Sequence, residues 1–264
     1  MTETQQRRSL IGAVFHGLLA LYAVFLLVYL VLRFTGIIEN NLLNFLHTFA
    51  LYLFIVPLVG GIITVFTGNI RLLMIQFLLV LMGVFWLGAR QAETFFVDPV
   101  LAEDSLVVLT FNMYPENEQF DVALQTILDY NADVVLLQEA NGDLSPIIDA
   151  YEFSYVQDMA TGYQHGIFSR YPLKDTGLIE LNGMENQRAE IQLPDDSSIA
   201  IYNLHLYMPL NEDESSPLLM RYDETRRNQQ ISELLSMVNL EDIPVIVGGD
   251  FNMSEYSPVY NDKN

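Results

Sequence analysis

The sequence contains no cysteine and few basic residues. The absence of cysteine excludes disulfides, thiolate metal sites and cysteine nucleophiles, and it is compatible with either side of a membrane. Only 12 Lys and Arg residues stand against 33 Asp and Glu residues. Because binding to a phosphate backbone depends on clustered Lys and Arg, this scarcity argues against generic nucleic-acid binding.

The charges are divided unevenly along the chain. Residues 1–99 hold five of the 12 basic residues and four of the 33 acidic residues, which leaves seven basic against 29 acidic residues and a net charge of −22 in 100–264. The whole chain is 51% hydrophobic with a mean hydropathy of +0.26, which is high for a soluble protein. The sequence therefore predicts an apolar N-terminal part in lipid and an acidic C-terminal part in water.

Three long apolar runs occupy the N-terminal part, at about 10–32, 42–66 and 72–89. Each approaches or exceeds the roughly 20 residues that cross a bilayer as a helix. The first run is longer than the apolar core of a cleavable signal peptide, which has about 7–15 residues, so we expect it to remain as an anchor. The predicted organisation is three transmembrane helices in 1–90, a connector in 91–104 and a second domain in 105–264.

Basic residues near the apolar runs predict the orientation. Arg7 and Arg8 precede the first run and Arg71 lies between the second and third, whereas Arg33 and Arg90 flank the opposite ends. Cytoplasmic ends carry the excess of Lys and Arg, and the excess here is three against two. We therefore expect a multi-pass protein of the cell membrane whose soluble domain lies outside the cytoplasm.

Beyond the connector, short apolar runs bounded by turn residues alternate with helical stretches, a pattern typical of α/β domains. The runs that predict strands are 106–111, 134–138, 166–169, 189–193, 199–206 and 245–248. Apolar residues at helical spacing predict two helices, within 120–128 and 231–238.

Polar residues lie at or near the ends of several predicted strands. Asn112 and Glu139 each follow a strand closely, and His205 lies within another. Asp250 and Asn252 follow the last strand, and alternation points both to one side. Taken singly, such an Asn is more typical of a turn, and such a His of a satisfied core position. Their combination in this order favours a functional site.

Five sequence blocks carry a resemblance to a known family. They are Leu-Thr-Phe-Asn at 109–112, Ala-Asp-Val-Val-Leu-Leu-Gln-Glu at 132–139, Gly-Ile-Phe-Ser-Arg-Tyr-Pro at 166–172, Asn-Leu-His-Leu at 203–206 and Gly-Gly-Asp-Phe-Asn at 248–252. Over about 105–260 the chain resembles the endonuclease/exonuclease/phosphatase superfamily, and with its N-terminal spans it is similar to the membrane-anchored bacterial type. The resemblance implies a two-sheet β-sandwich flanked by helices, as in deoxyribonucleases.

The resemblance also implies a divalent metal. Glu139 matches the principal metal ligand of the family, with Asn112 beside it at the metal and phosphate. The chemistry of the residues agrees, because Mg²⁺ prefers oxygen ligands and is usually held by one or two carboxylates with several waters. We expect Mg²⁺, with Mn²⁺ or Ca²⁺ as alternatives.

The catalytic roles are implied by the same resemblance. Asp250 would orient or deprotonate the attacking water, and Asn252 would hydrogen-bond the phosphoryl oxygens. His205 falls where the family places a phosphate-contacting residue, and Arg188 matches an Arg that can reach substrate. The expected activity is phosphoester hydrolysis by in-line attack of water, as a phosphodiesterase or a phosphomonoesterase. Tethering to a bilayer favours lipid-derived substrates. The sequence indicates no obligate protein partner.

One departure from the family pattern concerns the C-terminus. Family members close with a Ser-Asp-His block after further strands, whereas this sequence stops at Asn264 with no His beyond His205. We therefore expect an incomplete domain that hydrolyses phosphoesters poorly or not at all, since losing one such donor costs about 10²–10³ in rate. His165 is the first candidate for a substitute donor. The alternative is an inactive family member that serves as a membrane-tethered acidic binding domain.

The predicted orientation can be tested with reporter fusions. A reporter that is active only in the cytoplasm should give low activity when fused after Asn264, because Arg7, Arg8 and Arg71 hold the opposite ends of the helices inside. The same reporter fused in the turn at Arg71 is the control and should be active. High activity of the fusion after Asn264 would contradict the orientation.

Overall fold

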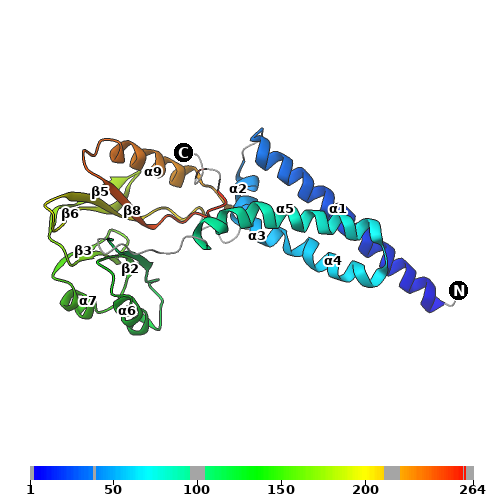
Figure 1. Ribbon diagram of the computed structural model, residues 1–264, viewed down its shortest axis with the longest axis horizontal. Helices are drawn as coiled ribbons and strands as arrows, with labels where there is room; N and C mark the ends of the chain where they lie inside the picture. Colours follow the sequence, from blue (N-terminus) through cyan, green and yellow to red (C-terminus); the bar gives the residue numbers. More distant parts are fainter. Residues whose placement is uncertain (1–2, 38–39, 96–104, 211–220, 258, 260–264) are drawn as a thin grey trace. The chain divides into compact units, whose positions relative to one another are not determined.

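The computed structural model describes residues 3–37, 40–95, 105–210, 221–257 and 259. These residues form two compact units (Figure 1). The first unit contains helices α1 to α5 together with residues 221–222, 254–257 and 259, and the second contains every described strand and the helices that cover them. Most of the predicted connector, at 96–104, lies outside the described residues.

The first unit is helical. Its helices are α1 (Glu3–Thr35), α2 (Asn41–Thr48), α3 (Ala50–Leu53), α4 (Ile55–Thr67) and α5 (Ile70–Phe95). Three segments are long and apolar enough to cross a membrane, namely Leu10–Thr35, Ala50–Thr67 and Ile70–Gly88. Within the predicted second span the helix is interrupted at Phe49 and Phe54. Pro57 lies in the first turn of α4, where its missing N–H costs no intrahelical hydrogen bond.

Close packing and polar contacts both occur inside the helical unit. A Cβ on Gly60 would lie 2.6 Å from Leu19 Cδ2, so a residue without a side chain lets α4 approach α1 closely. His16 Nε2 lies 2.8 Å from Thr67 Oγ1, and Tyr29 Oη lies 3.0 Å from His47 Nδ1. Both histidines therefore have hydroxyl partners within the unit.

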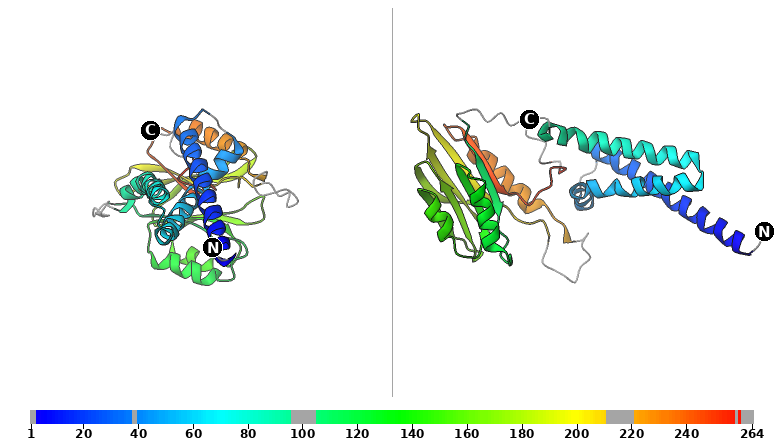
Figure 2. Two further views of the ribbon diagram at one scale, coloured as in Figure 1. Left: turned by 90° about the vertical axis from the view of Figure 1, so that its right-hand side faces the viewer. Right: turned by 60° about the horizontal axis from the view of Figure 1, so that its bottom comes forward.

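The second unit is a sandwich of two four-stranded sheets. The strands are β1 (Val108–Asn112), β2 (Val134–Ala140), β3 (Phe153–Asp158), β4 (Gln164–Ser169), β5 (Leu173–Leu181), β6 (Met184–Gln192), β7 (Ser198–His205) and β8 (Val245–Asp250). The first sheet has the order β1-β2-β4-β3 and the second β5-β6-β7-β8. Helices α6 (Phe120–Asp129) and α7 (Ser145–Ala150) cover the first sheet, and α9 (Thr225–Val238) covers the second (Figures 1 and 2). The predicted helix-flanked two-sheet architecture is confirmed.

Strand β2 is buried on both faces, which explains its continuous apolar sequence. Val135 and Leu137 pack toward α6 and α7, whereas Val134 and Leu136 pack toward the second sheet. All four side chains are fully buried. This strand therefore fixes the position of the first sheet between the two apolar cores.

Each sheet contains one pair of parallel strands, and each pair is joined through a helix. Strands β1 and β2 pair in parallel across α6, and β7 and β8 pair in parallel across α9. A parallel pair requires such a crossover, which brings the carboxyl ends of both strands to one edge. Asn112, His205 and Asp250 are the last residues of β1, β7 and β8, and Glu139 is next to last in β2.

A layer of buried amides joins the two sheets between the apolar core and these strand ends. Asn203 on β7 is fully buried, and its Nδ2 donates to Gln187 Oε1 at 2.8 Å and to the carbonyl oxygen of Leu137 at 3.0 Å. Its Oδ1 accepts from Gln138 Nε2 at 2.6 Å. Because Gln138 and Leu137 belong to β2, Asn203 connects the first sheet with the second.

Among the described elements of the second unit, two strands and one helix were not predicted from the sequence. Strand β3 is the edge of its sheet, and β5 has a register shift between Lys174 and Gly177. Both carry polar residues without regular alternation, so the period-2 pattern that identifies strands is weak there. Helix α7 has six residues, too few to show a helical period.

The substitution Asn203→Ala should lower the free energy of unfolding by about 3 kcal/mol or more, because it leaves several buried polar groups without partners at about 1–3 kcal/mol each. Asn141→Ala is the matched control, since Asn141 is exposed and the same change there should cost under about 0.5 kcal/mol. Urea denaturation of both full-length variants measures the difference. Equal stability of the two variants would contradict the role of Asn203.

Candidate active site

Two hydrogen-bonded pairs form the candidate site at the carboxyl ends of the parallel strands. Glu139 Oε1 lies 2.8 Å from His205 Nε2, which joins β2 to β7 across the two sheets. Asn112 Nδ2 donates to Asp250 Oδ2 at 2.8 Å and joins β1 to β8. His205 and Asp250 are register partners in the second sheet. The structure therefore brings these four predicted residues together.

Glu139 is aimed by an irregular backbone. The register between β2 and β4 shifts between Leu137 and Ala140, and Glu139 has a φ of +53°. A β-bulge re-aims side chains, and positive φ at a residue other than Gly is concentrated at functional sites. The Glu139 side chain keeps 18% of its surface accessible and that of His205 keeps 12%. The carboxylate is therefore held firmly and remains reachable.

Asp250 is held on both carboxylate oxygens. Oδ2 accepts from Asn112, and Oδ1 accepts from the backbone N–H of Asn252 at 2.8 Å. Asn252 has a φ of +46°, and its Nδ2 donates to the carbonyl oxygen of Leu206 at 2.8 Å. Gly249 precedes Asp250 with a φ of +135°, and a Cβ there would lie 2.0 Å from the carbonyl oxygen of Leu204. Only glycine fits that position.

Arg188 does not reach these residues in the structure. It lies on β6 between Gln187 and Ala189, which face the other sheet, so its own side chain points to the outer face. There it forms a bidentate ion pair with Glu241, with Nε to Oε1 at 2.7 Å and Nη2 to Oε2 at 2.8 Å. The hydrogen bonds from Arg188 lower the pKa of the Glu241 carboxyl. The guanidinium of Arg188 is already occupied by this carboxylate.

Arg227 was not among the site residues predicted from the sequence. It is fully buried on α9, and its Nη1 donates to the carbonyl oxygen of Asn252 at 2.8 Å. Its Nη2 lies 2.7 Å from Glu224 Oε1. The signal was present, because Arg227 precedes the buried Ile231 and Leu234 at helical spacing. A charge within an apolar stripe indicates a buried partner.

His165 lies beside the site without any hydrogen bond from its ring. His165 is 1% exposed, both ring nitrogens lack partners among the described residues, and the ring meets that of His205 edge-on with 5.6 Å between centroids. Burial, together with the nearby His205, lowers the pKa of His165 from 6.5 to about 3. The ring is therefore neutral at physiological pH.

The donor set fits a sparse magnesium-type site. Within the described ranges, no three His, Asp or Glu side chains form a cluster that could hold a metal ion. A closed zinc cage needs such a set, whereas Mg²⁺ is usually held by one or two carboxylates, with waters completing the shell. Glu139 with the amide oxygen of Asn112 offers oxygen donors of this kind.

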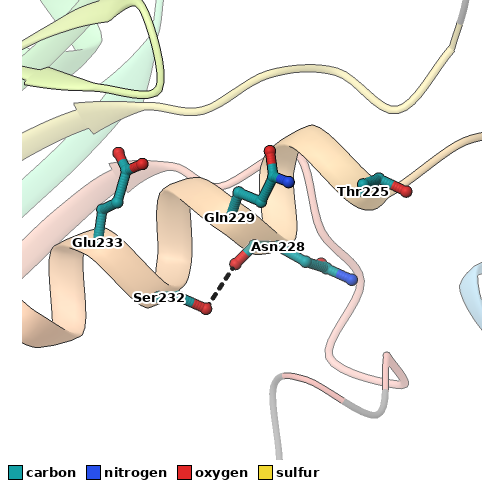
Figure 3. Close-up of a pocket in the computed structure, with 5 residues that line it drawn as sticks. All are labelled: Thr225, Asn228, Gln229, Ser232 and Glu233. Atoms are coloured by element: carbon teal, nitrogen blue, oxygen red, sulfur yellow. Dashed lines mark hydrogen bonds between the residues drawn. The ribbon is translucent and has the colours of Figure 1, made fainter.

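A separate hollow of about 490 Å³ lies on the surface of α9. Figure 3 shows that all five residues that line it come from this helix, namely Thr225, Asn228, Gln229, Ser232 and Glu233. Its single carboxylate, on Glu233, already accepts from the backbone N–H of Asn182 at 2.6 Å. Because the hollow offers neither a second carboxylate nor a cation, it does not fit a phosphoester site.

One family model matches more than half of the chain. The model of the Endonuclease/Exonuclease/phosphatase family matches residues 109–263. The comparison with curated proteins gave no match.

Similar solved structures include an endonuclease/exonuclease/phosphatase from Beutenbergia cavernae DSM 12333, at 17% identity and a TM-score of 0.43, covering 57% of this chain and 48% of that one. An AP endonuclease from Archaeoglobus fulgidus has 14% identity and a TM-score of 0.39, covering 56% and 58%. The 3′ phosphatase NExo from Neisseria, bound to a product DNA hairpin, has 17% identity and a TM-score of 0.39, also covering 56% and 58%. This chain spans about half the length of these structures.

The buried His165 should make stability depend on pH. Its pKa is about 3 in the folded state and 6.5 as the ordinary value. Below pH 6.5 the unfolded chain therefore binds a proton that the folded chain does not, and the free energy of unfolding should fall as pH drops from 6.5 toward 4.5, by up to about 1.4 kcal/mol per pH unit. His165→Phe keeps a ring without the titration and should show a shallower slope in denaturant unfolding. Identical slopes would contradict the buried neutral imidazole.

Proposed function

Because the chain belongs to the endonuclease/exonuclease/phosphatase family, we propose that it is a membrane-anchored, divalent-metal-dependent phosphoester hydrolase that uses in-line attack by water. Hydrolysis of phosphoester bonds is the general activity of the family. Metal dependence, membrane anchoring and the roles of individual residues are the specific parts of this proposal.

The observation that supports the proposal most strongly is that the Glu139–His205 and Asn112–Asp250 pairs lie together at the strand ends. Each pair joins one strand end of the first sheet to one strand end of the second. Two carboxylates, an imidazole and an amide thus gather at one edge of a rigid sandwich, where polar groups can act on a bound substrate.

Glu139 and Asn112 are the residues that would hold the metal. Their carboxylate and amide oxygens are ligands that Mg²⁺ prefers, and Mn²⁺ or Ca²⁺ can use the same donors. A bound divalent cation would stabilise negative charge on the phosphoryl oxygens. Asn112 Oδ1 accepts from the backbone N–H of Tyr114 at 2.9 Å, which fixes the orientation of the amide.

Asp250 is proposed to orient the attacking water and accept its proton. Each of its carboxylate oxygens already accepts one hydrogen bond, which fixes the plane of the group and leaves lone pairs for a water molecule. As the water oxygen bonds to phosphorus, the ester oxygen leaves on the opposite side. Asp250 takes up the proton that the water loses.

Asn252 and His205 are proposed to contact the phosphoryl group. One N–H of the Asn252 amide donates to Leu206, and the second N–H is available for a phosphoryl oxygen. His205 Nε2 is held by Glu139, and its Nδ1 is buried, so a contact of His205 with the phosphoryl group would replace the contact with Glu139. Donors held in place at a reacting phosphate stabilise the charge that develops in the transition state.

The proposed substrate is a phosphoester derived from lipid. Three helices of the chain are long and apolar enough to span a membrane, and the remainder carries a strong excess of acidic residues. A bilayer anchor brings the site close to lipid headgroups, and the acidic surface repels polyanions such as nucleic acid. We propose a multi-pass protein of the cell membrane with the soluble unit outside the cytoplasm.

The second candidate function is a membrane-tethered acidic domain that binds cations without turnover. The excess of acidic residues favours it. Both candidates bind a divalent cation through Glu139, whereas turnover belongs only to the hydrolase.

Glu139→Ala and Asp250→Ala should each lower the rate of phosphoester hydrolysis by about 10²–10³ or more relative to the unchanged chain, because each removes a charged group at the reacting phosphate. The measurement is Mg²⁺-dependent release of p-nitrophenol from its phosphodiester and phosphomonoester by the full chain in detergent. Comparing the two substrates separates the two classes of phosphatase activity.

Glu190→Ala is the matched control, since Glu190 lies on the outer face of β6, away from these residues. This control variant should retain the rate of the unchanged chain. Hydrolysis that survives both site substitutions would contradict the proposed function. Mn²⁺ binding without turnover, both by this chain and by a version extended through a Ser-Asp-His block, would favour the acidic binding domain.

A further inference from the structure

Arg227 is a buried cation for which the proposed chemistry has no use. It is the largest fully buried side chain among the described residues. Burying a charge is costly even when it is paired, and apolar replacements of buried ion pairs are often neutral or stabilising. Stability of the fold alone is therefore a weak reason for an arginine at this position of α9.

The partners of Arg227 show what the cation holds. Nη1 donates to the backbone carbonyl oxygen of Asn252 at 2.8 Å, and Nη2 lies 2.7 Å from Glu224 Oε1. Glu224 is 2% exposed and fixes the guanidinium from the other side. The contact is to the main chain of Asn252 rather than to its amide, so Arg227 orients this residue without using its functional group.

The loop that Arg227 contacts is under backbone constraint. Gly249 has a φ of +135° and Asn252 a φ of +46°. Apart from the contact with Arg227, Asn252 is held by Asp250 Oδ1, which accepts from its N–H, and by the carbonyl oxygen of Leu206. A residue in this left-handed conformation persists only when its surroundings determine it. The hydrogen bond from Arg227 to the carbonyl oxygen of Asn252 is the third contact that holds this conformation.

The position of Asn252 also affects the carboxylate of Asp250. The N–H of Asn252 holds Asp250 Oδ1, so a shift of Asn252 moves the carboxylate as well. We propose that Arg227, locked by Glu224, is a positioning residue that fixes Asn252 and, through it, Asp250 for binding and attack at the phosphoryl group. The part of this inference that concerns the phosphoryl group rests on the proposed function.

The experiment uses four forms of the full chain in detergent: unchanged, Arg227→Met, the double variant Glu224→Gln with Arg227→Met, and Leu234→Ala. Leu234 is 2% exposed on the same helix, so its truncation destabilises α9 without removing a contact to Asn252. The double variant also neutralises the buried carboxylate that faces Arg227, and it should regain stability relative to the single variant.

The first readout is hydrogen exchange of the backbone amides in 250–253, measured under conditions in which all forms have the same free energy of unfolding. In both Arg227 variants the amide hydrogens of 250–253 should exchange about 10- to 100-fold faster. This factor corresponds to the loss of one hydrogen bond to a charged group. Leu234→Ala should exchange like the unchanged chain in this loop. If the amides of 250–253 regain their protection from exchange when the double variant regains stability, the inference is overturned. Arg227 would then contribute only to the stability of the fold.

The second readout is the affinity for inorganic phosphate in the presence of Mg²⁺, with turnover of p-nitrophenyl phosphate alongside. Both Arg227 variants should lose affinity by about tenfold or more, and kcat should fall further than KM rises, because Asp250 acts on the water rather than on substrate binding. Phosphate affinity equal to that of the unchanged chain would also overturn the inference. If the unchanged chain binds no phosphate, the proposed function fails, and the exchange measurement still decides whether Arg227 positions the loop.

Discussion

The hydrogen bonds of Asn203 join the two sheets at the level where the apolar core ends, and the geometry of the candidate site depends on them. Below this level the two sheets meet through aliphatic side chains, which set their spacing without fixing their register. At Asn203, amide bonds to Gln138 on one sheet and Gln187 on the other impose a defined alignment. One residue beyond Gln138 lies Glu139, and two beyond Asn203 lies His205, so the aligned strands place the carboxylate and the imidazole within hydrogen-bond distance.

The site contains several features that a fold optimised only for stability would avoid. Glu139 and Asn252 adopt positive φ angles, and His165 buries two ring nitrogens that have no partner among the described residues. Arg227 buries a guanidinium on the helix face that also buries Gln230, Ile231 and Leu234. Each of these features is destabilising by itself, and the rigid sandwich around them makes them tolerable. Their location around one group of strand ends is what would be expected of a site shaped by chemistry.

Most of the architecture could be predicted from local patterns. The three apolar runs, the continuous apolar strand β2 and the stripe of α6 are visible because burial repeats at the period of the element. Strands β3 and β5 escaped prediction because their polar sequences lack that period. Glu139 and Asp250 could be proposed as partners in one site because family motifs preserve their order. Their roles in the reaction stay predictions.

The sequence by itself determined which segments are apolar, where the strands of the two parallel pairs end, and which family motifs lie at those ends. Only the tertiary structure decided which side chains meet. Arg188 matched a family motif, yet it lies on the outer face of β6, bound to Glu241, which is 53 residues away. Arg227 lies in none of the family motifs, yet it contacts Asn252, which is 25 residues away. Local pattern encodes the face on which a residue lies, whereas its partner is set by how distant segments pack, and that information lies in no single stretch of the chain.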